Sequence, residues 1–114
     1  MSDFFKNEMV RGDIQEMAEL QQYCIRAMMS FPALSPEKQY EYFEVLSTLI
    51  DKQKIFYTRL SLSDDPEARD MLKSMKDGAV LLGAEPEDDI MEMFNGLLEK
   101  VEKMKEEAQR RMDA

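Results

Sequence analysis

The densest group of side chains that could do chemistry is a run of carboxylates near residue 88. Its members are Glu85, Glu87, Asp88, Asp89 and Glu92. Carboxylate oxygens are the ligands that Mg²⁺ and Ca²⁺ prefer, so this run is the first place to look for a metal site. It lacks the spacing and the glycine of an EF-hand loop, and carboxylates are favoured at a helix N-terminus without any metal. We therefore expect an acidic patch here and no metal site.

Few other groups in the chain could catalyse a reaction. There is no His, and the single Cys, Cys24, falls within an apolar helical stripe. The absence of imidazole removes His-based acid–base catalysis, His-containing triads and imidazole zinc sites. Neither a glycine-rich phosphate loop nor a nucleophile elbow occurs in the sequence. We expect no catalytic residue and no bound cofactor, so the protein is not predicted to be an enzyme.

Length and charge restrict the remaining functions. The chain has 114 residues, of which 24 are acidic and 15 basic, and its net charge is −9. This charge disfavours direct contact with nucleic-acid phosphates and with an anionic membrane surface. The apolar content of 44% is enough for one hydrophobic core, so residues 1–114 are predicted to form a single domain. The sequence shows no secretory leader and no membrane-spanning run, which predicts a cytoplasmic protein.

The elements that must position these residues are all helices. Apolar residues recur at steps of three and four, which indicates amphipathic helices, and no segment alternates like a strand. The helices are expected over about residues 7–31, 36–62, 65–82 and 86–112. Asn7 and Ser35 are predicted N-caps, and Asp64 with Glu67 fits a capping box. Gly12 is a place where the first helix could begin late or kink.

These helices predict an all-α, bundle-like fold that is incomplete on its own. The short proline-containing connection after residue 31 implies that the first two helices form an antiparallel hairpin. Helices of about 25 residues extend close to 38 Å, and a shorter third helix cannot cover their apolar stripes alone. We therefore expect self-association or a protein partner. The narrow apolar seam after Leu98 is the expected contact.

Eleven methionines are the main oddity of the composition. They could fill irregular gaps in the core, or they could form an adaptable protein-binding surface. The candidate interaction surface combines residues of the second and fourth helices, namely Phe56, Tyr57, Met91, Phe94, Leu97, Leu98, Val101 and Met104. The leading hypothesis is a non-catalytic helical interaction module that forms homo-oligomers and possibly also binds a host protein.

The excess of acidic over basic residues supports an alternative hypothesis. A small protein that presents carboxylates where an enzyme expects phosphates could act as a phage-type decoy for a basic polymerase or nuclease. The candidate residues are those of the acidic patch, chiefly Glu85, Glu87, Asp88 and Asp89. The two hypotheses differ in salt dependence, because electrostatic binding weakens as salt is added and apolar binding does not.

Three stretches carry a resemblance to a known family. They are residues 4–10, with Phe4-Phe5 before Asn7, residues 49–63, a basic-aromatic helix that ends in Leu-Ser, and residues 93–105. Together they resemble a small uncharacterised all-helical domain family of cyanobacteria and their phages. The resemblance implies a small helical cytoplasmic protein. It implies no activity, cofactor or site residue.

Overall fold

The protein is built from helices. The computed structural model describes residues 3–81 and 89–114, and within these ranges it contains helices and no strand, which confirms the predicted all-α class. The elements are α1 (Asp3–Lys6), α2 (Glu8–Met29), the 3₁₀ turn η1 (Phe31–Ala33), α3 (Pro36–Leu62), α4 (Pro66–Leu81) and α5 (Ile90–Asp113). The expected end of the third helix at 82 and start of the fourth at 86 lie outside the described residues. None of the described helices is both long enough and apolar enough to cross a membrane.

Two of the predicted N-caps start their helices as expected. The side-chain oxygen of Asn7 accepts hydrogen bonds from the backbone N–H groups of Met9 at 2.8 Å and Val10 at 3.4 Å. The hydroxyl of Ser35 accepts one from the N–H of Lys38 at 3.3 Å. Each cap satisfies amide groups that have no partner within the helix, which stabilises it by about 1 kcal/mol.

The cap of α4 differs from the prediction, which placed it at Asp64. Asp65 is the capping residue, and its carboxylate accepts hydrogen bonds from the backbone N–H of Glu67 and of Phe4, both at 3.0 Å. Proline is favoured at the first helical position, so Pro66 fixes the residue before it as the cap. Asp65 therefore starts one helix and also holds the N-terminal segment against it.

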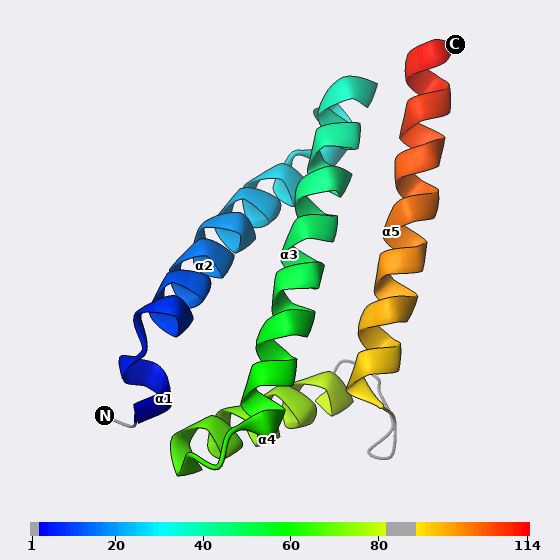
Figure 1. Cartoon of the computed structure of the whole chain (residues 1–114). Helices are drawn as coiled ribbons and strands as arrows, with labels where there is room; N and C mark the ends of the chain where they lie inside the picture. Colours follow the sequence, from blue (N-terminus) through cyan, green and yellow to red (C-terminus); the bar gives the residue numbers. More distant parts are fainter. Residues whose placement is uncertain (1–2, 82–88) are drawn as a thin grey trace.

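The three long helices lie side by side in one layer. α3 is in the centre, α2 and α5 flank it, and neighbouring helices run antiparallel (Figure 1). The short α4 crosses the layer at the C-terminal end of α3, and α1 lies beside it (Figure 1). The molecule measures 52 × 32 × 20 Å, and its radius of gyration of 16.1 Å exceeds the value of about 13 Å expected for a compact domain of this length. The layer is therefore open, with two broad faces.

Two apolar clusters hold the helices together. The upper cluster joins α2, α3 and α5, and its buried members are Cys24, Tyr42, Phe43, Leu49, Ile50, Val101 and Ala108. The lower cluster lies where α4 and α1 meet α2 and α3, and its buried members are Val10, Phe56, Leu60 and Ala68. Phe4 and Phe5 pack against this lower cluster, which explains the short helix α1 that hydrophobic periodicity did not predict. Burial of these side chains is the main stabilising contribution to the fold.

Two ion pairs fix α2 against α3 in addition to the apolar contacts. Arg59 pairs with Asp13, and the ammonium of Lys52 lies 3.0 Å from the carboxylate of Glu16. Both pairs are about one-third to one-half exposed, so each contributes at most about 1 kcal/mol. α2 begins at Glu8 and continues through Gly12, so the later start considered from the sequence does not occur.

Candidate functional site

An apolar groove runs along the upper part of the layer, between α2 and α5 and above α3. Its volume is about 430 Å³. We call it the apolar groove and define it by its lining residues Met28, Phe31, Pro32, Tyr42, Phe43, Leu46 and Met104. These residues come from four elements that are distant in sequence, so the groove is a product of the layer and not of any one helix.

The floor of the groove is a cluster of three aromatic rings. The ring of Phe31 lies 5.6 Å from that of Tyr42 and 5.5 Å from that of Phe43, with edge-to-face tilts. The rings of Tyr42 and Phe43 are 5.3 Å apart. Edge-to-face pairs at these distances are favourable, so the floor is firmly packed. A firm floor lets the groove keep its shape in the absence of a partner.

The walls of the groove consist of exposed methionines. Met28 on α2 is 60% exposed and Met104 on α5 is 44% exposed. Leu97, one heptad before Met104 on the same side of α5, is 45% exposed. Flexible thioether side chains above a rigid aromatic floor can adapt to the surface of another protein. Tyr42 carries the one ionisable side chain among the groove's lining residues, and burial raises the pKa of its phenol above the ordinary value.

Cys24 lies beneath this region and takes no part in its surface. Its side chain is buried in the upper cluster between α2 and α3. Burial raises the pKa of the Cys24 thiol above its ordinary value. A raised pKa lowers the thiolate fraction at neutral pH, so this cysteine is a core residue and a poor nucleophile.

The residues of the predicted interaction surface differ in their exposure to solvent. Leu97 and Met104 are exposed as expected, and Tyr57, Met91, Phe94 and Leu98 are half-buried. Phe56 and Val101 are only 3% exposed, so for these two the expectation of an accessible surface is wrong. Phe56 is covered by α1, whose Phe4 ring lies 6.1 Å away, and Val101 packs in the upper cluster with α3 residues.

The same packing occupies part of the seam after Leu98. Val101 and Ala108 are buried in the cluster that joins α5 to α3, whereas Met104 stays 44% exposed. Six of the seven groove residues were not in the predicted surface, namely Met28, Phe31, Pro32, Tyr42, Phe43 and Leu46. The paired methionines at positions 28 and 29, beside the proline break, were the signal that could have indicated them.

The acidic patch is described only in part. Glu85, Glu87 and Asp88 lie outside the described residues. Asp89 is the N-cap of α5, and its carboxylate accepts a hydrogen bond from the backbone N–H of Met91 at 2.9 Å. Glu92 is exposed in the first turn of the same helix. Among the described side chains, no three acidic or cysteine groups gather closely enough to hold a metal ion.

The role of Asp89 as a cap can be tested with two variants. Asp89→Ala is expected to lower the free energy of unfolding by about 1 kcal/mol, because the first turn of α5 loses a hydrogen-bond acceptor. Asp89→Asn keeps an acceptor at the same place, so it is expected to retain most of that stability. Urea denaturation followed by circular dichroism measures both. Equal losses in the two variants would show that the charge, and not the cap, is what matters.

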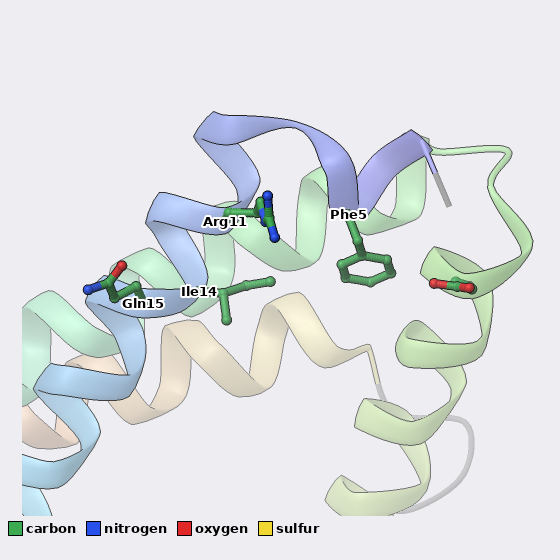
Figure 2. Close-up of a pocket in the computed structure, with 5 residues that line it drawn as sticks. Phe5, Arg11, Ile14 and Gln15 are labelled. Atoms are coloured by element: carbon green, nitrogen blue, oxygen red, sulfur yellow. The ribbon is translucent and has the colours of Figure 1, made fainter. Parts of the chain in front are cut away.

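A second hollow lies at the opposite end of the molecule, where α1, α2 and α4 meet. It has a volume of about 620 Å³ and is lined by Phe5, Arg11, Ile14, Gln15 and Glu67. Figure 2 shows Phe5 and Ile14 facing the space between these helices, with Arg11 beside them. Arg11 and Glu67 are exposed, and their charges oppose each other across an apolar base. The hollow is wide and mixed in character, which makes it a weaker binding surface than the apolar groove.

The fold and the groove define an all-α protein with an open helical layer and an apolar groove. A family model described as Domain of unknown function (DUF1825) matches residues 2–108. The chain therefore belongs to this domain family, and the predicted membership of an uncharacterised family is confirmed at this level. Comparisons with curated proteins and with solved structures found no match.

Proposed function

We propose that the protein is a non-catalytic helical interaction module that works as a homo-oligomer. The observation that carries this proposal is the apolar groove, which lies open on one face of a layer only one helix thick. A helix of a soluble protein normally covers its apolar stripe with a neighbour. In this chain α3 is flanked by α2 and α5, and on the groove side Met28 and Met104 stay 60% and 44% exposed above the aromatic floor.

The surface area of the chain supports the proposal. Its accessible surface is 7842 Å², whereas a compact monomer of 13.4 kDa exposes about 6,500 Å². The excess is therefore about 1,300 Å² per chain. Permanent homodimers bury about 1,000–2,500 Å² from each subunit, so the excess is of the size that self-association would remove.

Measurement of the molecular mass in solution tests this proposal. We expect size-exclusion chromatography with light scattering to give at least twice the 13.4 kDa of one chain. The mass should persist when the salt concentration rises from about 0.05 M to about 0.5 M, since salt screens the repulsion between acidic chains and leaves apolar contacts intact. A mass of one chain at every protein concentration and salt would contradict the proposal.

We further propose that the module acts in the cytoplasm of a cyanobacterial cell, either as a cellular or as a phage protein. The resemblance of residues 49–63 to a family of cyanobacteria and their phages supports this setting. A tagged chain can be used to capture partners from a cyanobacterial lysate, with elution in steps of increasing salt. A partner that stays bound at high salt would indicate an apolar contact at the groove.

The acidic decoy is the less supported of the two functions. The described residues of the acidic patch are Asp89 and Glu92. Both lie at the start of α5, where carboxylates stabilise the helix without any partner. The rest of α5 mixes acidic residues with Lys and Arg, so no extended surface of one sign follows from its sequence. Release of a captured partner at low salt would favour the decoy over the interaction module.

A further inference from the structure

We propose that the apolar groove is covered by a second copy of this chain, packed face to face and antiparallel, with α5 lying against α5 of the partner. This inference rests on the proposed homo-oligomer and specifies its interface and symmetry. The two layers would then form a closed double layer around a two-fold axis. Met104 of the groove and Leu97, one heptad earlier on α5, would lie at its centre.

The first argument is that only one part of the α3 face needs covering. Leu46, Gln53 and Leu60 are spaced by seven residues, so they lie on one side of α3. Leu60 is fully buried in the lower cluster, where α4 and α1 cover it. Leu46 lines the apolar groove, and Gln53 between them is half-buried. Along this side of α3 the chain therefore buries Leu60 completely and Leu46 only in part.

The second argument concerns orientation. Leu46 of the groove and Leu60 lie on one side of α3, and Leu60 is buried with residues of α4 and α1, so α4 and α1 project from the groove side at one end of the layer. In a parallel pair these projections would meet at the same end and hold the two faces apart. In an antiparallel pair, α4 and α1 of one copy lie at the opposite end of the dimer from α4 and α1 of the other copy. Each set then lies beyond the groove of the other copy. The shape of the layer thus selects the antiparallel arrangement.

The third argument is the pattern along α5. Met93, Leu97, Lys100 and Met104 follow steps of four, three and four, which places them along one side of the helix. An antiparallel pair centred near Lys100 sets Leu97 of one copy opposite Met104 of the other. Lys100 then lies beside Lys100 of the partner. Its long aliphatic side chain lets the ammonium group reach solvent at the edge of the interface.

The ends of α5 add charge complementarity. Asp89 at the start and Arg111 near the end belong to the same side of the helix, and both are exposed. In the antiparallel pair centred near Lys100, Asp89 of one copy meets Arg111 of the other, and the contact occurs twice. A parallel pair would bring like charges together at both ends. The charges therefore favour the same orientation as the shape.

A symmetric cross-link tests the register. Lys100→Cys is expected to form a disulfide-linked dimer when the protein is oxidised with oxidised glutathione, because the two thiols meet at the two-fold axis. Lys103→Cys is the matched control, since its side chain points away from α3 on the outer side of α5 and is exposed. The native Cys24 is buried and should not cross-link in either variant. Non-reducing electrophoresis reports the result.

A pair of charge insertions tests the surface. Met104→Glu is expected to raise the dissociation constant of the dimer at least about a hundredfold, since it places two unpaired charges in an apolar interface. Ile55→Glu is the control, because Ile55 is 55% exposed but lies nine residues from Leu46, on the opposite side of α3. Lys100→Leu is expected to tighten the dimer about tenfold by removing the paired ammonium groups at the axis. Sedimentation velocity at several protein concentrations gives the constants.

The outcomes separate the two proposals. A wild-type chain that is monomeric throughout would overturn the proposed function and this inference together. A wild-type dimer that tolerates Met104→Glu, or that cross-links through Lys103→Cys and not through Lys100→Cys, would overturn this inference alone. Circular dichroism of each variant distinguishes loss of association from loss of folding, because a dissociated but folded variant keeps its helical spectrum.

Discussion

Replacement of Leu60 by alanine is expected to lower the free energy of unfolding by about 3 kcal/mol. Among the described residues Leu60 is the largest side chain that is completely buried, and it lies where α3 meets α4 and α1. Removal of a buried leucine side chain loses its transfer free energy and leaves a cavity, with a total cost of about 2–5 kcal/mol. Urea denaturation at a fixed protein concentration measures the change, since the stability of an oligomer depends on concentration.

Leu62→Ala is the matched control for this experiment. Leu62 is two residues further along the same helix and is 79% exposed, so its truncation should change the stability by less than about 0.5 kcal/mol. Similar losses for the two variants would show that the lower cluster is not packed as described. A large loss at Leu60 alone would confirm that α4 is anchored to the layer at this position.

Val101→Asp is expected to lower the free energy of unfolding by at least about 3 kcal/mol, which is enough to unfold many small domains. Val101 is 3% exposed in the cluster that joins α5 to α3. A carboxylate at this place would be buried among apolar groups without a partner, and α5 would have to separate from α3 to hydrate it. Thermal and urea unfolding followed by circular dichroism measures the effect.

The control for Val101→Asp is Lys103→Asp, which places the same charge on the outer side of α5. Its expected cost is under about 1 kcal/mol, from like-charge repulsion with nearby glutamates. If Val101→Asp had the stability of the wild type and only its oligomeric state changed, Val101 would belong to an intermolecular surface, as the sequence alone suggested. The two variants therefore decide between core and interface.

The helices could be predicted from the sequence because their signals are local. The caps at Asn7 and Ser35 combine a side-chain acceptor with the following helical stripe, and Pro36 fixes the first turn of α3. These features depend only on residues within one turn of each other. The start of α4 was misplaced by one residue because two aspartates precede Pro66 and either can act as an acceptor.

The faces of the helices could not be predicted in the same way. The apolar arc of α3 is broad, since it packs against α2 on one side and α5 on the other, and periodicity does not say which neighbour covers which part. Val101 was therefore expected on the surface although α3 covers it. Phe4 and Phe5 gave no periodic signal because α1 has only four residues, so the burial of Phe56 beneath α1 was not foreseen.

The position of the groove could not be predicted from the sequence. The excess of methionine is compatible with core filling and with an adaptable surface, and of the candidate surface residues only Leu97 and Met104 are exposed, at 45% and 44%. The groove itself depends on the approach of Met28, Phe31 and Leu46 from elements that are not adjacent in sequence to α5. No local sequence pattern predicts that these residues lie close together, because their positions depend on how α2 and α5 pack against α3.

The placement of α3 between two helices also determines how the effects of substitutions combine. α2 and α5 make their main contacts with α3 and few with each other, so residues on their outer sides share no partner. Substitutions at distant sites without common partners change stability additively, whereas substitutions within one packed cluster do not. Variants on the outer sides of α2 and α5 should therefore combine as a simple sum, while buried variants of either helix should couple to changes in α3. The central helix is thus the element through which the energetics of the whole layer are linked.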